Sequence, residues 1–297
     1  MRDRSNCKRG ASMALLVAGV MSASAGAAVA EEQKPDLPLW ELRLGGSALY
    51  APDYPGAEDY QTRGIGAPIF IYRGERLRIG GDDPTAIARA IAVDEPRFEF
   101  DLSLNAAYPA DSEDGEAREG MTDLDTQLEI GPQATFNLFD TGWTEEGRKR
   151  LRFLLPVRAV GATDFSDFEE LGYTVQPTLT WRRQYPGDRQ TSYSASLTAV
   201  WASEGVQDYY YEVEPEFATP TRAAYDAEGG YLGTHINISG RREIRPNLHL
   251  FLTYQARYLG GAVNEDSPLL REDLTHAVSF SFVWTALSSS RPARDRE

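Results

Sequence analysis

The chain has 297 residues, with 30 Lys and Arg against 45 Asp and Glu, and a formal net charge of −15. An acid excess of this size argues against nucleic-acid binding through a basic surface. With one cysteine, no disulfide framework is possible. The mean hydropathy of −0.44 excludes a bundle of long apolar helices.

The N-terminus predicts export. A basic start is followed by an uncharged stretch over 11–30 that ends in Ala28-Val29-Ala30, a small-x-small cleavage pattern. A membrane anchor is the alternative, but the stretch is mostly Ala, Gly and Ser and only weakly hydrophobic. We expect a signal peptide over 1–30. Its removal takes away Cys7 with four basic residues and one acidic residue, which leaves a formal charge of −18.

The remainder divides into a short periplasmic N-terminal segment over 31–38, a barrel over 39–287 and a polar C-terminal tail over 288–297. Apolar and polar side chains alternate in the barrel region, for example from Thr191 to Trp201. Since a strand points successive side chains to opposite faces, period 2 predicts a sheet with one oily and one wet face. We expect strands near 39–51, 62–72, 75–81, 86–93, 97–109, 125–139, 151–163, 172–184, 191–203, 230–243, 247–260 and 275–286.

These elements predict an all-β fold, a transmembrane antiparallel up-and-down β-barrel of about twelve strands, the kind of even number expected of a single-chain bacterial barrel. Ten strands remain possible if 75–93 does not cross twice. Candidates for the lipid-facing side include Leu44, Tyr50, Phe100, Tyr108, Trp181, Leu252, Phe280, Phe282 and Trp284. Short connections such as 245–246 alternate with long ones such as 110–124 and 204–229, which predicts periplasmic turns and outer loops. A soluble β-sandwich would show the same alternation, but the many aromatic residues on the oily face disfavour it.

The wet face predicts a charged lumen. Its inward positions carry five acidic and five basic residues, which in a barrel of this size should pair and narrow the bore. We therefore predict a lumen charge network and a plugged or very narrow barrel, with a narrow porin or solute channel as the alternative. The predicted members are Glu41, Arg43, Glu99, Asp101, Asp125, Glu129, Arg152, Arg158, Arg182 and Arg257.

An outer-membrane hydrolase is a weaker hypothesis. His235, Asn237 and Ser239 alternate on the polar face of one strand and are residue types that a hydrolase uses. Residues two apart on a strand lie about 7 Å apart, however, and that spacing alone makes no proton relay. No phosphate-binding glycine loop or Cys/His metal cluster is visible, so we expect no enzyme activity, metal or cofactor. The acidic outer loops suggest a shared divalent cation with lipopolysaccharide phosphates.

Several segments carry a family resemblance when taken in order. They are 50–56 (YAPDYPG), 67–75 (APIFIYRGE), 123–132 ending in Gly131-Pro132, 208–213 (DYYYEV) with 224–226 (AYD), and 266–269 (DSPL). In these the chain resembles the MipA/OmpV family of Gram-negative outer-membrane proteins, named for a member that interacts with the murein hydrolase MltA. The resemblance runs from about Trp40 to Trp284. One departure is the tail, because Thr285 to Glu297 continues beyond the final strand.

The resemblance implies location in the Gram-negative outer membrane, in contact with outer-membrane lipid and lipopolysaccharide. It implies a scaffold or adaptor for peptidoglycan-remodelling enzymes. The partners it implies are a lytic transglycosylase and a bifunctional murein synthase.

Overall fold

The computed structural model describes residues 37–74, 77–79, 86–90, 94–95, 97–186 and 191–293. The predicted signal peptide over 1–30 lies outside the described residues, as do most of the segment 31–38 and the end of the tail. Parts of the predicted strands 75–81 and 86–93 lie outside them too. The division of the chain into these segments therefore stays a prediction.

Nearly all described elements are strands. They are β1 (Trp40–Pro52), β2 (Tyr60–Arg73), β3 (Leu77–Ile79), β4 (Ala86–Ala90), β5 (Asp94–Glu95), β6 (Phe98–Ala107), β7 (Thr126–Asp140), β8 (Arg148–Thr163), β9 (Phe168–Val175), β10 (Thr178–Gln184), β11 (Ser192–Ala202), β12 (Gly230–Arg245), β13 (Leu248–Tyr258) and β14 (Leu274–Ser288). The described helices are α1 (Glu204–Tyr211) and the short 3-10 turns η1 (Ser112–Asp114) and η2 (Pro215–Phe217).

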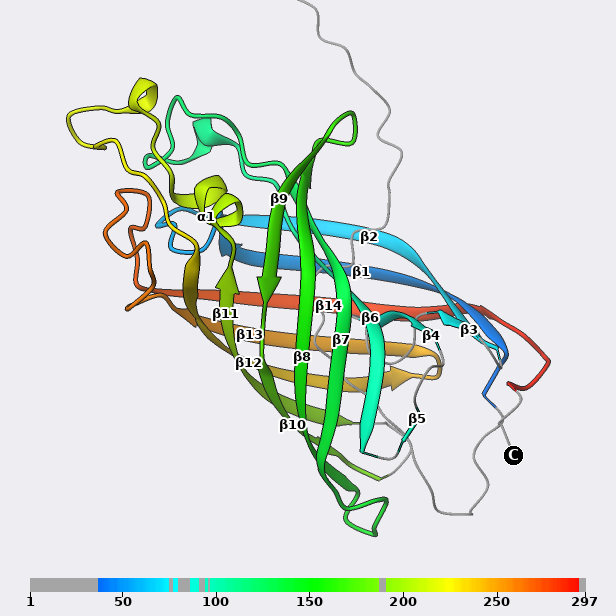
Figure 1. The fold of residues 1–297 in the computed structure, drawn as a ribbon. Helices are drawn as coiled ribbons and strands as arrows, with labels where there is room; N and C mark the ends of the chain where they lie inside the picture. Colours follow the sequence, from blue (N-terminus) through cyan, green and yellow to red (C-terminus); the bar gives the residue numbers. More distant parts are fainter. Residues whose placement is uncertain are drawn as a thin grey trace, which may run out of the picture.

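The strands pair antiparallel around a closed path. Each strand from β10 to β14 pairs with the next, β14 pairs with β1, and the ladder continues through β2, β3, β4, β6 and β7 to β8. β8 then pairs with both β9 and β10, and β10 returns to β11. The all-β antiparallel barrel predicted from the sequence is thereby confirmed (Figure 1).

The predicted strand over 172–184 is interrupted. β9 ends at Val175 and β10 begins at Thr178, and the residues between them include Pro177, which has no N–H to give to a ladder. The neighbouring strands still bond across the break: the Gln176 N–H donates to the Pro156 carbonyl at 3.2 Å, and the Ala199 N–H donates to the Pro177 carbonyl at 3.2 Å. The sheet has 14 strands, of which β5 pairs only with β6. With β9 and β10 taken as one strand, twelve described strands remain around the closed path.

The outer surface of the barrel is apolar. Phe280, Phe282 and Trp284 on β14 are 50%, 42% and 47% exposed, and large apolar side chains on the other long strands are exposed in the same way. A protein in water does not leave so many large apolar groups uncovered, whereas a bilayer covers them. The barrel is therefore a transmembrane one. Among the described residues, no helix has the length and apolar character to cross a membrane.

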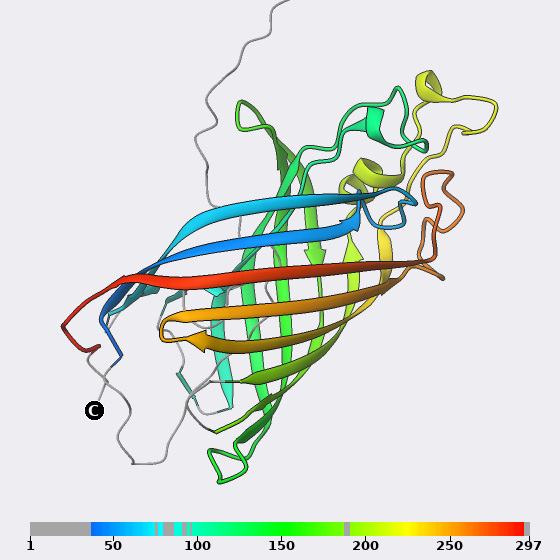
Figure 2. The same ribbon diagram turned by 180° about the vertical axis from the view of Figure 1, so that it is seen from behind.

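The two ends of the barrel differ. The connections before β2, β7, β9, β12 and β14 gather at one end, which we call the loop end, and α1 lies among them (Figures 1 and 2). The opposite turn end holds the start of β1, the end of β14 and the tight connections 141–147 and 246–247. Pro38 forms an isolated bridge with Pro292, so the first and last described segments lie side by side there.

Candidate functional site: the lumen and its cavity

The lumen contains a cavity of about 310 Å³. Its walls are the inward side chains of most long strands, and α1 contributes Val206, Tyr209 and Tyr210 at the loop end. The walls carry many hydroxyl, amide and charged groups, because the inward positions of a strand alternate with the apolar outward ones, together with apolar side chains such as Leu124, Leu154 and Leu232. The charged residues that line the cavity are Asp53, Arg63, Asp125, Glu129, Arg152, Arg158 and Arg257.

Loop residues pack into an apolar cluster over the loop-end mouth. We call this cluster the cap; its buried members are Tyr54, Ala57, Ala110, Leu124, Val206, Tyr210, Tyr211, Val213, Ala227, Leu259, Ala262, Leu269 and Leu270. They pack against barrel residues that include Val160, Val200 and Leu232. The outer loops therefore cover the mouth of the barrel.

Buried hydroxyls hold the cap together. The Tyr54 hydroxyl donates to the Leu269 carbonyl at 2.8 Å, and the Tyr211 hydroxyl donates to the Pro55 carbonyl at 2.9 Å. The Tyr210 hydroxyl donates to Gln127 Oε1 in the barrel wall at 2.5 Å. Burial raises the pKa of both Tyr210 and Tyr211. These phenols therefore stay neutral donors, and they tie α1 to the barrel and to the first loop.

Arg118 joins the loop over 108–125 to α1. Its Nη1 donates to the Tyr210 carbonyl at 3.3 Å, and its Nη2 donates to the Thr122 carbonyl at 3.1 Å. Burial lowers the pKa of Arg118, but a guanidinium stays charged at neutral pH. The cap therefore contains a positive charge that is satisfied mainly by backbone carbonyls.

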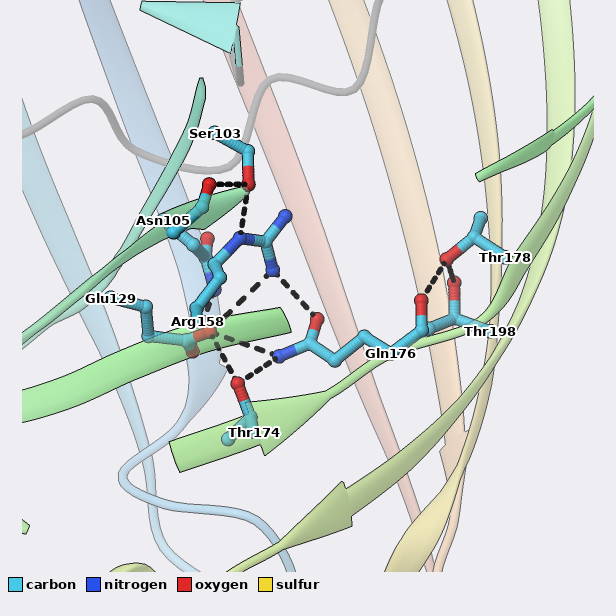
Figure 3. Close-up of polar contacts among 9 residues, drawn as sticks. Ser103, Asn105, Glu129, Arg158, Thr174, Gln176, Thr178 and Thr198 are labelled. Atoms are coloured by element: carbon cyan, nitrogen blue, oxygen red, sulfur yellow. Dashed lines mark hydrogen bonds and ion pairs between the residues drawn. The ribbon is translucent and has the colours of Figure 1, made fainter. Parts of the chain in front are cut away.

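One wall of the lumen carries a paired charge. Arg158 on β8 lies 3.5 Å from Glu129 on β7, and it also donates to Ser103 Oγ at 2.9 Å and Gln176 Oε1 at 3.2 Å. Glu129 in turn accepts from Asn105 at 2.9 Å and from Thr174 at 3.0 Å (Figure 3). Neutral amide and hydroxyl groups thus surround an ion pair of which both members are buried.

The wall formed by β12 and β13 carries a charge without such a partner. Arg257 on β13 and His235 on β12 are direct partners in the ladder and both line the cavity. Arg257 Nε and His235 Nδ1 are buried and have no hydrogen-bond partner within the described part of the chain. The predicted member Arg257 therefore does not join the Arg158 and Glu129 group.

Two further members of the predicted network lie together at the turn end. Arg43 Nε donates to Glu41 Oε2 at 2.6 Å, and Arg73, which was not predicted, approaches Glu41 Oε1 at 2.8 Å. All three side chains are largely shielded from solvent. One carboxylate therefore balances two guanidinium groups where β1 begins.

Five predicted members of the network remain. Glu99 accepts from Asn137 at 3.2 Å, and Arg182 donates to Ser192 at 3.1 Å. Asp101 and Arg152 are buried, and Arg152 also lines the cavity. Asp125 lies just before β7 and not within a strand; its backbone N–H donates to the Tyr209 hydroxyl at 2.5 Å. Burial, Asp164 and Asp123 raise the pKa of Asp125.

Two of the three residues of the hydrolase hypothesis, Asn237 and Ser239, bond to neighbouring strands through their side chains. Asn237 Oδ1 accepts from Gln255 at 2.9 Å, and the Ser239 hydroxyl lies 2.7 Å from the Ser194 hydroxyl. His235 Nδ1 has no described partner. A relay would need the histidine to reach the serine. The bonds of these residues run across strands instead.

Sequence reasoning missed several cavity residues. Arg63 on β2 pairs with Asp53 at 2.6 Å, and Gln127, Gln133 and Gln176 project into the lumen. Gln127 and Gln133 lie on the same face of β7 as Glu129, so the alternation that predicted Glu129 to point inward would have predicted them as well. Tyr108, taken as lipid-facing, lines the cavity instead. It follows the end of β6 at Ala107, where the strand alternation no longer applies.

The match to a family model covers most of the chain. Residues 44–286 match the family described as MltA-interacting protein MipA. The chain belongs to the MipA family. With its closed antiparallel sheet and apolar outer surface, this MipA-family chain is an outer-membrane β-barrel. No curated protein matches the chain.

The chain is also similar to solved channel structures, at low identity. An outer-membrane channel from Pseudomonas putida F1 is 11% identical with a TM-score of 0.46, and the match covers 86% of this chain and 99% of that one. The NanC porin is 10% identical with a TM-score of 0.34, and the match covers 83% of this chain and 100% of that one. The CymD monoaromatic hydrocarbon channel is 11% identical with a TM-score of 0.31 over 82% and 88% of the two chains. These likenesses are too distant to decide function.

Proposed function

We propose that this protein is a non-enzymatic outer-membrane scaffold that holds a lytic transglycosylase, together with a bifunctional murein synthase, next to the peptidoglycan. The observation that carries the proposal is the family match over 44–286, since the family is described by its interaction with MltA, a lytic transglycosylase. The cap adds support. A mouth covered by packed loops suits a scaffold better than a general porin.

The scaffold would present its turn end to the periplasm, because bacterial barrels keep their short connections there. The protein would reach the membrane by export and cleavage of the signal peptide. Lipid and lipopolysaccharide would then cover the apolar belt. We find no group of three or more metal-ligating side chains among the described residues, so a cation shared with lipopolysaccharide would need ligands from both molecules.

Site-specific photo-crosslinking in intact cells tests the scaffold. A photoreactive residue replaces Glu145, which is exposed in the turn-end connection 141–147, and in a matched strain it replaces Glu216 at the loop end. We expect mass spectrometry to identify a lytic transglycosylase on the Glu145 variant and not on the Glu216 variant. Absence of any murein enzyme from both variants, at normal barrel levels, would contradict the scaffold.

A narrow channel is the second candidate, and the cavity favours it. A space of about 310 Å³ inside a barrel, lined by both polar and apolar side chains, suits a small solute. Conductance across planar bilayers separates the two functions. The scaffold predicts small or absent currents for the wild-type protein, whereas large ion-selective currents would place the channel first.

A further inference from the structure

The β12–β13 wall of the cavity holds an uncompensated positive charge. Arg257 and His235 face each other across the ladder and both line the cavity. Arg257 Nε and His235 Nδ1 are buried without a hydrogen-bond partner in the described structure. Buried polar atoms in native proteins nearly always have a partner, and these two orphan atoms belong to neighbouring side chains that both line the cavity, which points to a partner from outside the chain.

The other cavity arginines differ from Arg257. Arg158 approaches Glu129 at 3.5 Å, and Arg63 approaches Asp53 at 2.6 Å. Arg152 also has an interaction within the protein. Arg257 Nε, by contrast, is buried with no hydrogen-bond partner among the described residues. Because a guanidinium stays charged at all physiological pH values, this charge is permanent.

The surroundings of Arg257 restrict what could fit. The hydroxyls of Ser194, Ser196, Thr198, Thr253 and Thr275 line the same cavity, and the rings of Tyr209 and Tyr210 form its roof. Asn237 and Gln255, next to His235 and Arg257 on their strands, bond to each other at 2.9 Å. The hydroxyl and amide groups of these walls offer many weak donors and acceptors near the Arg257 cation, which suits a hydroxylated anion better than a cationic solute.

We propose that the cavity binds a small hydroxylated solute that carries one oxyanion, a sugar acid or a sugar phosphate, with the oxyanion held by Arg257 and His235. The Arg257 guanidinium would donate two parallel hydrogen bonds to the oxyanion, and His235 would donate a third. The wall hydroxyls would bond to the hydroxyls of the solute. The cavity volume of about 310 Å³ lies at the small end of known ligand sites and fits one sugar ring.

This site is independent of the scaffold, since a barrel can bind a solute whether or not it also holds an enzyme. Calorimetry on the full mature protein in lipid nanodiscs tests it with three probes. Galacturonate supplies a carboxylate, glucose 6-phosphate supplies a phosphate, and galactose is the neutral control. We expect at least one anionic probe to bind at least tenfold more tightly than galactose. Which anion binds distinguishes a carboxylate site from a phosphate site.

Variants of Arg257 and His235 test whether these residues form the binding site. Arg257→Gln should weaken binding of that anion at least tenfold, because it removes the charge and the two parallel hydrogen bonds. Arg271→Gln is the matched control, since Arg271 lies at the loop end, paired with Glu58 at 3.0 Å and outside the cavity. If Arg257→Gln does not fold, two further variants test the site. Arg257→Lys keeps the charge but loses the two-pronged guanidinium, and His235→Asn removes the second donor. Each should weaken binding of the anion. Equal binding of galactose, no binding of either anion, or unchanged binding by the folded Arg257 variants would overturn the proposal.

Discussion

Arg158 and Arg257 show how differently one residue type behaves within a single lumen. Both project inward, yet Arg158 lies beside the Glu129 carboxylate and donates to two neutral acceptors, Ser103 and Gln176. Arg257 Nε has no hydrogen-bond partner among the described residues. Alternation along a strand predicts only that a side chain points inward. The partner that it meets depends on the register of strands distant in the sequence, such as the pairing of Glu129 with Val160.

Replacing Arg158 with Ala should destabilise the barrel. The change leaves Glu129 buried with a charge that Asn105 and Thr174 only partly stabilise. Breaking a buried pair from one side costs about 3–5 kcal/mol. The measurement is the temperature at which the folded band is lost on unboiled gels in detergent, which we expect to fall clearly.

Arg271→Ala is the comparison for this variant, because its pair with Glu58 is largely exposed and such pairs contribute about 0–1 kcal/mol. The double variant Arg158→Ala with Glu129→Ala should recover part of the loss. If Arg158→Ala and Arg271→Ala lose the folded band at similar temperatures, the lumen charges are solvated and their pairing contributes little to stability.

Asp208 on α1 predicts a pH dependence of the cap. Burial, with Glu212, Glu204 and Asp226 nearby, raises the pKa of this carboxyl to about 6. The pKa of Asp208 is higher in the folded than in the unfolded chain. The protonated carboxyl therefore stabilises the cap fully at pH values below the unfolded pKa, and this stabilisation is lost as the pH rises through 6. Hydrogen-exchange protection of the α1 amides should therefore be greater at pH 4 than at pH 7.

Asp208→Asn removes the titrating group and supplies the control. Its α1 protection at pH 7 should exceed that of the wild type, while the two proteins should agree near pH 4. If the wild type and the variant lose protection in parallel across this range, the pH effect comes from other carboxylates, of which Glu204 and Glu212 are the nearest in sequence.

At the scale of elements, the strands were predictable and the cap was not. Period 2 identified strands such as β11 and β14 because each has one apolar face towards lipid and one polar face towards the lumen. The segment containing α1 was placed in the longest outer loop, and its helix was missed. Its apolar side chains pack against other loops, a contact that no local periodicity records. The break at Pro177 was also missed, although proline in a strand indicates one.

Gly131 on β7 marks a close approach of two strands. A Cβ built on Gly131 would lie 2.0 Å from the Val157 carbonyl oxygen of β8, whereas a Cβ on Gly66 of β2 would meet nothing nearer than 3.7 Å. Backbone atoms cannot move aside as a side-chain end can. Gly131→Ala should therefore force β7 and β8 apart and lower the yield of folded barrel.

Gly66→Ala, also in a strand, should fold nearly as the wild type does. The readout is the fraction of folded protein after refolding into detergent micelles, measured on unboiled gels. Similar yields from the two variants would mean that the β7–β8 contact tolerates a shift, and the close approach would then have no special role in folding.

At the scale of the whole molecule, the apolar belt and the closed ladder predict a typical outer-membrane protein. The mature chain should begin near Glu31 and should migrate differently before and after boiling in detergent, because the closed hydrogen-bonded sheet resists detergent until heated. N-terminal sequencing and gel migration of the membrane fraction measure both properties. A soluble periplasmic product with no shift on heating would contradict the membrane assignment.

The cap and the lumen together determine whether the barrel conducts. Tyr210 and Tyr211 connect the cap to the wall through Gln127 and to the first loop through Pro55. Replacing both tyrosines with Ala removes two buried rings, at about 3–5 kcal/mol each for large aromatic truncations, and should loosen the cap while the strand ladder stays intact. We expect single-channel conductance to rise from a low wild-type level, with the heat-modifiable band preserved. Glu216→Ala, an exposed loop change, should leave the conductance unchanged. A low current in the double variant would locate the constriction among the lumen charges below the cap, and a large wild-type current would show that the cap does not restrict passage.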